Sequence, residues 1–236
     1  MKKIWANCAL TLAIAGALAI PLGAPNEAKA DDGGGDSGQA YSQIHDWYVG
    51  HGVPDKVASR LAADILHGKM PQSSQPNANP VAEDTHRDGS WVVTTRRFAD
   101  GSVTESRLEQ PLPQAAGGIT TLSVGACEGT IRGTNYTNYK NCRVEETSAY
   151  LILSFRADYP QAYGIGVVDA LRQPYEWAVG GTASTPSFST SRKSQSSSGP
   201  ATAVGKSLYK TPYSSANVSI TLKVTGTSAS SSRSGF

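Results

Sequence analysis

The chain has 236 residues, of which 39% are hydrophobic and 17% charged, and its formal net charge is +2. Once residues 1–30 are set aside, 18 basic and 18 acidic residues remain, and this balance argues against nucleic acid or an anionic membrane as a partner. A chain of this length forms one domain with a hydrophobic core and short appendages.

Residues 1–30 predict a cleavable secretory signal peptide. Lys2 and Lys3 form a positive region, residues 8–22 are apolar, and AKA at 28–30 has the small-x-small pattern of a cleavage site. The apolar run is too short for a transmembrane helix, so we expect no stable membrane span after cleavage. An uncleaved anchor is the alternative. The sequence therefore predicts a secreted, extracellular protein.

The segment after the signal predicts a leader, two short helices and a linker. Residues 31–38 have too little apolar content to fold and are expected to form a flexible leader. Helices are expected at about 39–49 and 54–67, and in the second one apolar residues recur at every fourth position. Residues 70–80 are polar and interrupted by proline. The helical segment with its linker thus spans 39–88.

From residue 89 on, the pattern changes to β-strands. An Asp-Gly pair at 100–101, between two β-rich runs, predicts a hairpin followed by a linker within 89–118. Many short strand candidates follow, and residues 151–157 alternate in the way typical of a half-buried antiparallel sheet. The sequence therefore predicts a mainly β fold: an antiparallel β-sandwich at 119–226, preceded by two short helices and a linker.

Two segments flank the predicted sandwich. The hairpin at 90–108 either joins it or stands apart with the helices, because both arrangements fit the pattern. Residues 227–236 are rich in serine and poor in large apolar side chains. They are expected to form a disordered tail.

Two cysteines, Cys127 and Cys142, remain after the signal peptide, fifteen positions apart. In an exported protein they are expected to pair. Closing a loop of this size contributes about 3 kcal/mol, largely by restricting the unfolded chain. Two free thiols are the alternative, and a zinc site is disfavoured because two ligands at this spacing lack companions.

The segment between the cysteines repeats the pattern Asn-Tyr-x and is the candidate binding site. Tyrosine offers a rigid face with a polar tip, and asparagine offers both a donor and an acceptor. A disulfide pre-organises such a loop and lowers the entropy lost on binding. The candidate residues are Tyr136, Asn138, Tyr139 and Lys140. The alternative is a hairpin loop whose tyrosines pack on the sheet.

Two patterns bear on catalysis. The sequence GDSG at 35–38 resembles the surroundings of a serine nucleophile, but only the signal peptide precedes it, so the base of a triad has no place upstream. The β region contains carboxylates that a glycosidase pair would need. These are Glu128, Glu145, Glu146, Asp158, Asp169 and Glu176. A catalytic residue is not assigned, because the sequence places no two of them in one cleft.

The histidines all lie in one part of the chain, with aspartates among them. They are His45, His51, His67 and His86. Imidazole and carboxylate suit zinc, but these spacings match no zinc site, so we expect surface and helix-cap roles and neither a metal nor a cofactor. The Ser/Thr-rich stretch at 182–207 resembles a pore-forming strand pair only weakly, because its apolar face is thin.

Several segments resemble a set of secreted actinobacterial proteins of unknown function. They are GVPDKVASRLAADILHGK at 52–69, RRFADGSVTESRLEQP at 96–111, the cysteine pair around a Gly/Asn/Tyr loop, and LSFRADY at 153–159. The resemblance spans most of the chain after the signal peptide. It implies export and a β-rich domain, and it implies no particular chemistry.

These patterns together favour a non-enzymatic extracellular binding or interaction protein at or near the cell envelope. An envelope or polysaccharide component is the expected kind of partner, and nucleic acid is not. A secreted hydrolase, acting for example on carbohydrate, is the second hypothesis, and a β-type toxin or bacteriocin is the third.

Overall fold

A computed structural model describes residues 34–75, 77–110, 127 and 129–235 of the protein. The predicted signal peptide at 1–30, the predicted linker at 111–118, the first residues of the predicted sandwich (119–126) and Glu128 lie outside the described residues. Two helices, α1 (Gly34–Gly50) and α2 (Asp55–Leu66), come first and are followed by a short 3-10 turn, η1 (Gln72–Ser74).

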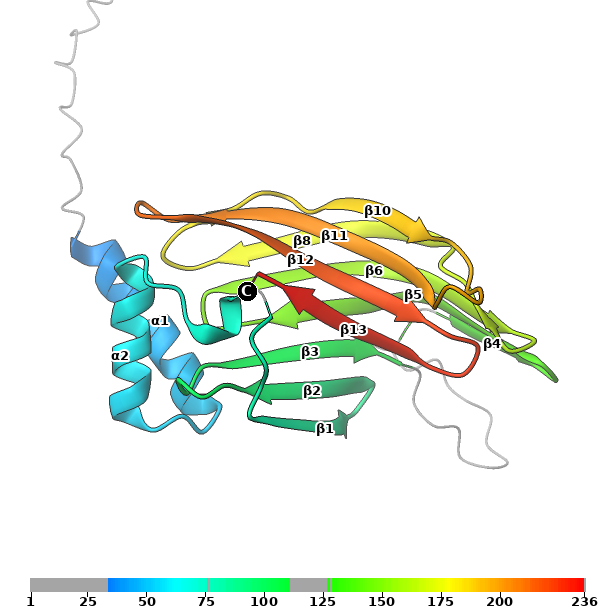
Figure 1. The fold of residues 1–236 in the computed structure, drawn as a ribbon, viewed down its shortest axis with the longest axis horizontal. Coiled ribbons are helices and arrows are strands. Elements are labelled where there is room, and N and C mark those ends of the chain that lie inside the picture. The colour runs from blue at the N-terminus through cyan, green and yellow to red at the C-terminus, as the bar shows by residue number, and fades with distance from the viewer. Residues whose placement is uncertain (1–33, 76, 111–126, 128, 236) are drawn as a thin grey trace, which may run out of the picture. The chain divides into compact units, whose positions relative to one another are not determined.

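The rest of the described chain is almost entirely β-structure (Figure 1). The strands are β1 (Ala82–Asp88), β2 (Trp91–Arg97), β3 (Val103–Glu109), β4 (Gly129–Gly133), β5 (Tyr136–Thr147), β6 (Leu151–Ala162), β7 (Ile165–Gly166), β8 (Ala170–Ala178), β9 (Thr182–Ala183), β10 (Ser187–Arg192), β11 (Ala201–Lys210), β12 (Ser215–Val224) and β13 (Ala229–Ser234).

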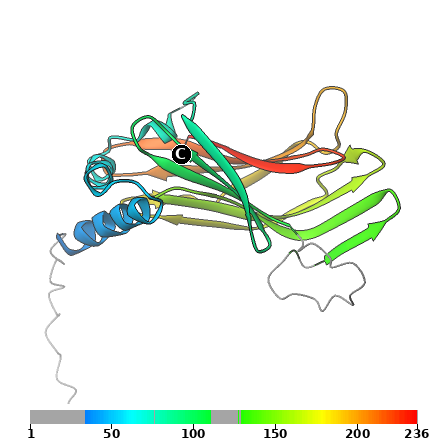
Figure 2. The same cartoon turned by 90° about the horizontal axis from the view of Figure 1, so that it is seen from below.

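These strands form two antiparallel sheets that pack in two layers, as Figure 2 shows from below. The first sheet has eight strands in the order β1-β2-β3-β5-β6-β7, with β4 paired to β5 and β8 paired to β6. The second has five strands in the order β10-β11-β12-β13, with β9 paired to β11. The expected mainly β, sandwich-like fold with two preceding helices is confirmed.

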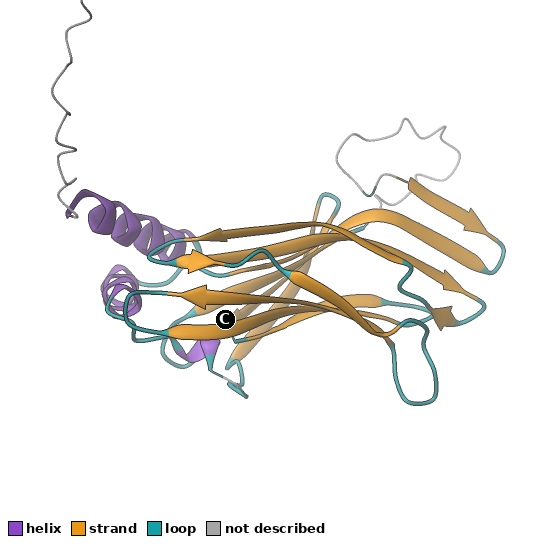
Figure 3. Ribbon diagram, turned by 90° about the horizontal axis from the view of Figure 1, so that it is seen from above, coloured by secondary structure: helices purple, strands orange, loops and turns teal. Residues whose placement is uncertain are grey.

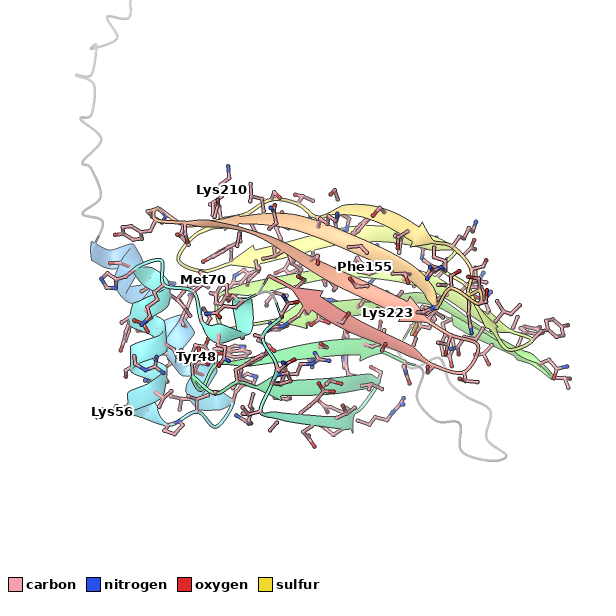
Figure 4. All side chains as sticks on the ribbon, in the orientation of Figure 1. Tyr48, Lys56, Met70, Phe155, Lys210 and Lys223 are labelled. Carbon is pink, nitrogen blue, oxygen red and sulfur yellow. A yellow bond between two sulfur atoms is a disulfide. The ribbon has the colours of Figure 1, made fainter. Side chains whose placement is uncertain are left out.

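The core lies between the two sheets, on what we call the inner face of each. Leu151, Leu153 and Phe155 alternate along β6 and are fully buried there. The ring of Phe155 meets that of Phe188 from the second sheet at 5.2 Å. Phe155 is labelled in Figure 4. Ile220 on β12 is likewise fully buried. The period of two in the sequence of β6 thus corresponds to one side that faces the core and one that faces outward.

The helices close one end of the sandwich, as Figures 1 and 3 show. Helix α2 begins directly after Pro54, whose fixed φ suits a helix start. Its apolar stripe is buried with Leu61 and Ile65, and Ile44 and Tyr48 of α1 are fully buried beside it. Helix α1 begins at Gly34, so the predicted flexible leader is wrong over 34–38, where the chain is helical.

The predicted linker after α2 is packed and partly structured. Ser73 and Ser74 of η1 are buried, and the Ser74 hydroxyl lies 2.5 Å from the Tyr150 hydroxyl. The backbone N–H of Gln72 donates to Asp100 Oδ2 at 2.7 Å. Strand β1 then occupies Ala82–Asp88, within the segment predicted as helical segment and linker. This strand escapes prediction because all seven side chains are exposed, so no apolar alternation marks it.

The predicted hairpin joins the main sheet instead of standing apart with the helices. Strands β2 and β3 pair from Trp91↔Glu109 to Arg97↔Val103, close to the predicted boundaries. Strand β3 then pairs with β5 through Leu108↔Val144. The segments predicted as separate, 39–88, 89–118 and 119–226, therefore belong to one compact unit.

The predicted disordered tail at 227–236 is wrong over Ala229–Ser234, which form strand β13. This strand pairs with β12 from Val224↔Ala229 to Ser219↔Ser234. Its order comes from backbone pairing and from polar side chains that reach the interior, neither of which requires apolar residues.

Candidate functional site

The segment between the two cysteines is a β-hairpin that continues into the first sheet. Cys127 and Cys142 form the predicted disulfide, with an S–S distance of 2.03 Å. Strands β4 and β5 pair down to Gly133↔Tyr136, which leaves a two-residue turn. A Cβ on Gly133 would come within 2.1 Å of the Tyr136 ring, so glycine leaves room for that ring. We call residues 127–142 the stapled hairpin.

The alternation of strand β5 divides the candidate residues of the stapled hairpin. Tyr139 pairs with Tyr159, and the two rings stack at 4.8 Å with an angle of 17°. Tyr159 is 1% exposed in the core, so Tyr139 lies on the inner face. Tyr136 and Asn138 pair with β6 at alternate positions and face the other way. The Tyr136 side chain is exposed.

Lys140 is exposed and lies at an irregularity in β5, where the register shifts between Tyr139 and Cys142. Asn141 sits in this bulge with a φ of 54°. The structure thus places Tyr136 and Asn138 on one surface and turns Tyr139 away from it.

The side of the first sheet that points away from the second sheet is called the outer face here. Arg143 on β5 pairs with Arg156 on β6, which pairs with Arg172 on β8. Directly paired residues project to the same side, and neighbouring strands lie about 4.8 Å apart. These three residues therefore form a line across three strands, which we call the arginine row. Each of the three side chains is partly exposed.

A carboxylate holds each member of the arginine row. Glu145 Oε2 lies 2.6 Å from Arg143 Nη2, and Glu109 Oε2 lies 3.5 Å from Arg156 Nη1. The carboxylate of Asp158 accepts hydrogen bonds from both terminal nitrogens of Arg172, at 2.8 and 2.5 Å.

The environment of Asp158 favours its charged form. Burial by itself opposes ionisation, but the Arg172 guanidinium and the backbone N–H of Asn141 outweigh it and hold the pKa of Asp158 below its usual value. The bulge at Asn141 also presents its carbonyl oxygen to Arg156 Nη1 at 2.7 Å. The row is therefore fixed in orientation before any ligand arrives.

Aromatic side chains lie beside the arginine row. The guanidinium carbon of Arg143 is 5.7 Å from the centre of the Tyr175 ring, and that of Arg107 is 5.0 Å from the centre of the Trp91 ring. Both distances fall within the range of cation–π attraction. Tyr175 reaches this side because the register of β8 shifts near Gln173, which has a φ of 50°.

A hollow of about 510 Å³ opens between Arg143, Arg156 and Tyr175. It is lined by Arg143, Ser154, Phe155, Arg156, Gln173, Pro174 and Tyr175. Arginine stays protonated at physiological pH and presents five N–H donors in a planar fork. The hollow is thus suited to holding oxygen-rich or anionic groups, and its arginines are unsuited to proton transfer. Among the described residues no cluster of His, Cys, Asp and Glu suits a metal ion.

The candidate acids of the hydrolase hypothesis are distributed over both sides of the sheet. Glu145 lies on the outer face, whereas Glu146 is fully buried inside. Asp158 is held by Arg172, and Asp169 lies 3.7 Å from Lys193. Adjacent residues on opposite faces cannot flank one bond, so Glu145 and Glu146 do not form a glycosidase pair.

The histidines have local partners, as their scattered spacing suggests. His45 lies 3.0 Å from both Asp46 and Asp55. His51 Nδ1 is 2.6 Å from the Trp47 carbonyl oxygen, and its Nε2 is 3.4 Å from Glu105. Burial lowers the pKa of His51, but these two acceptors outweigh it and raise the pKa above its usual value.

The remaining two histidines and the serine of the GDSG motif also lie away from the arginine row. His67 bonds the Ala63 carbonyl oxygen, and His86 lies 3.3 Å from Asp84. Ser37 is in the first part of α1. It lines a separate hollow of about 730 Å³ between the helices and the loops after β8 and β11.

The structure also contains an interior polar cluster that the sequence did not reveal. Glu146 Oε2 accepts a hydrogen bond from Ser106 Oγ at 2.7 Å. Burial raises the pKa of Glu146 to about 7, although Ser106, Arg233 and Ser231 act in the opposite direction. Arg233 of β13 donates to the Ser73 carbonyl oxygen at 2.9 Å. The sequence contained one indication of this cluster: Glu146 comes two residues after buried Val144 and therefore occupies an inward position of β5.

The Ser/Thr-rich stretch at 182–207 forms β9, β10 and most of β11 in the second sheet. Its inward residues Ala201 and Ala203 are fully buried. In the described part of the chain, no helix has the length and apolar character needed to cross a bilayer.

Comparison with known proteins adds little to this description. No family model matches the chain. No curated protein matches it either. Among solved structures, the chain is similar to a hypothetical protein of Listeria monocytogenes EGD-e. The two are 16% identical, the match covers 59% of this chain and 90% of that one, and the TM-score is 0.31. A TM-score this low does not establish a shared fold.

Proposed function

We propose that this protein is a non-enzymatic extracellular binding protein that acts at or near the cell envelope. Its binding surface is the outer face of the first sheet around the arginine row. The export signal predicted at 1–30 and the Cys127–Cys142 disulfide both support an oxidising compartment.

The observation that carries the proposal is the hollow between Arg143, Arg156 and Tyr175. Arginine and tyrosine are the side chains in which binding energy is most often concentrated. Here Glu145 and Glu109 already hold the two guanidinium groups, so little side-chain entropy remains to be lost on binding.

The stapled hairpin extends the same surface. Tyr136 and Asn138 lie further along β5 on the outer face, toward the two-residue turn of the stapled hairpin. The binding role first assigned to the hairpin is thereby kept for these two residues and becomes part of a larger surface. Tyr139, which packs on Tyr159, has no part in it.

Co-sedimentation tests the proposal. The oxidised protein, purified from culture medium, is mixed with isolated cell envelopes or insoluble polysaccharides and centrifuged. An Arg143→Ala/Tyr175→Ala variant removes the two sides of the hollow. A Lys206→Ala/Tyr213→Ala variant removes one cation from β11 and one exposed tyrosine from the turn between β11 and β12, and it is the matched control. Thermal unfolding checks that all three proteins are folded.

We expect the wild type and the control to pellet with at least one fraction and the outer-face variant to stay in solution. If the outer-face variant pellets as well as the control, the binding surface lies elsewhere. If the folded wild type stays in solution with every fraction, the binding function itself is refuted.

A further inference from the structure

We propose that the ligand of the outer face is an anionic polysaccharide, a sugar polymer bearing carboxylate or phosphate groups, and that Arg143 and Arg156 hold its oxyanions. This inference rests on the proposed binding function and names its ligand class. Both side chains line the hollow, whereas Arg172, the third member of the row, does not.

The contacts of the three arginines explain why Arg143 and Arg156 can bind a ligand and Arg172 cannot. Asp158 engages both terminal nitrogens of Arg172. Within the described residues, Glu145 engages only Nη2 of Arg143, and Glu109 and the Asn141 carbonyl both meet Nη1 of Arg156. The other nitrogens of Arg143 and Arg156 therefore remain for a ligand. A planar guanidinium fork matches the oxygens of a carboxylate or a phosphate.

The spacing of the two arginines favours an anion between them. The Cβ atoms of direct cross-strand partners on one face lie about 5 Å apart, so the Arg143 and Arg156 side chains leave the sheet side by side and their positive charges repel each other. Glu145 is shared between Arg143 and Arg107, so Glu145 and Glu109 balance only two of these three positive charges. An oxyanion bound between the guanidinium groups would balance the remaining positive charge. The charged group of the ligand is therefore expected to lie between Arg143 and Arg156.

The other lining groups suit a sugar. Tyr175 presents a flat ring with a polar tip beside Arg143, and Gln173 and Ser154 provide amide and hydroxyl groups. Further along the face, Tyr136 and Asn138 repeat the pairing of an aromatic ring with an amide. A polymer lying along β5 would therefore meet similar groups at two places.

The charge of the whole chain disfavours nucleic acid as the ligand. Phosphate-backbone binding depends on many cations spread over a surface. The formal net charge here is only +2, and the arginines of the outer face are accompanied by Glu109, Glu145 and Asp158. A few oxyanions placed along a polar chain fit this arrangement better.

Affinity electrophoresis in native gels tests the ligand class with polymers that share one backbone. The gels contain dextran, carboxymethyl-dextran or dextran phosphate, and the two charged forms separate a carboxylate from a phosphate source. Gels with duplex DNA test the nucleic-acid alternative. We expect retardation in one or both charged dextrans, none in plain dextran, and weaker retardation in DNA.

Variants locate the interaction. Arg143→Gln/Arg156→Gln is expected to raise the apparent Kd for the charged dextran at least about tenfold, since two charge-assisted contacts are lost. Lys206→Gln/Lys223→Gln removes the same charge from exposed positions of the second sheet and should change the Kd less than about twofold. Arg143→Lys keeps a cation beside Glu145 but lacks the fork, so weakened binding by this variant remains informative if the double variant fails to fold.

The outcomes separate this inference from the proposed function. If envelopes bind the wild type through the outer face but charged dextrans do not compete, the binding function stands and the ligand class is wrong. If protease treatment of the envelopes abolishes that binding, the ligand is a protein and the inference fails. Equal losses in the arginine and lysine variants, or tighter binding to DNA than to charged dextrans, would also overturn it.

Discussion

Glu145 and Glu146 are consecutive residues of strand β5, yet their carboxyl groups lie on opposite faces of the first sheet. Glu145 Oε2 holds Arg143 on the outer face at 2.6 Å, whereas Glu146 Oε2 accepts a hydrogen bond from Ser106 inside the sandwich. Strand alternation alone separates them. One short segment therefore contributes both to the proposed binding surface and to the interior polar cluster.

The first prediction concerns the pH dependence of stability. Burial raises the pKa of Glu146 from 4.5 to about 7, so the folded protein binds more protons than the unfolded chain between these values. The free energy of unfolding should therefore fall as the pH rises from about 5 to 8, with Glu146 contributing ~3 kcal/mol. Urea unfolding of the oxidised protein at several pH values in this range measures the loss.

Glu146→Gln isolates this contribution. The pKa of His51 is also raised. Its protonation therefore stabilises the fold as well, and this stabilisation is also lost as the pH rises above the ordinary pKa of histidine. The decisive quantity is therefore the difference between wild type and variant at each pH. The slope should be smaller in Glu146→Gln and unchanged in Glu145→Gln. Equal slopes in the wild type and Glu146→Gln would show that Glu146 titrates alike in both states.

The second prediction concerns Arg233 and the order of strand β13. A terminal nitrogen of Arg233 is buried although the residue as a whole is only partly so, and burial lowers the pKa of the guanidinium to about 10. Arg233→Met should destabilise the protein by about 2 kcal/mol at pH 8, because Glu146 then loses its nearby cation and takes up a proton, and the hydrogen bond to the Ser73 carbonyl oxygen is also lost.

A double-mutant cycle with Glu146→Gln tests the origin of that loss. At pH 5, where Glu146 is largely neutral, Arg233→Met should cost less than at pH 8. Combined with Glu146→Gln, it should also cost less than it does alone. Strictly additive effects at both pH values would mean that Arg233 stabilises the fold through its other contacts, such as the bond to the Ser73 carbonyl oxygen, and not through Glu146.

The third prediction separates the two tyrosines of the stapled hairpin. Tyr139→Ala removes a ring stacked on buried Tyr159 and should destabilise the protein by about 2 kcal/mol. Tyr136 is 42% exposed, so Tyr136→Ala should change the free energy of unfolding by less than about 0.5 kcal/mol. Denaturant unfolding of both variants decides this, and a larger loss for Tyr136→Ala would reverse the assignment of faces.

The fourth prediction concerns the disulfide. Cys127→Ala/Cys142→Ala should lower the free energy of unfolding by about 3 kcal/mol, since a closed loop of fifteen residues restricts the unfolded chain. Calorimetry with and without dithiothreitol measures it. The reductant should lower the Tm of the wild type and leave that of the variant unchanged. A wild type insensitive to complete reduction would contradict a stabilising role.

The sequence was most informative where its pattern is local. Alternation along residues 151–157 predicted a strand with one buried side, and β6 buries Leu151, Leu153 and Phe155 as expected. The Asp-Gly pair at 100–101 predicted the turn between β2 and β3. Strands β1 and β13 were missed because their polar side chains provide no such alternation, and their order depends on neighbouring strands.

The candidate site required information that no local pattern contains. Arg143, Arg156 and Arg172 are 13 and 16 positions apart along the chain and lie side by side only because β5, β6 and β8 pair in one register. From the sequence, Tyr139 was grouped with Tyr136 because the segment was interpreted as a loop. The segment is a strand, and in a strand these two side chains point to opposite faces of the sheet.

By itself, then, the sequence determined the mainly β fold class, the second helix, the disulfide partners and the apolar strands. Each of these depends on periodicity or on spacing within a short segment, where burial and chain entropy act directly on neighbouring residues. Only the tertiary structure decided which charges meet on the outer face, which tyrosine enters the core and that a serine-rich end becomes a strand. Those outcomes depend on the pairing of distant strands, because register fixes which side chains share a face.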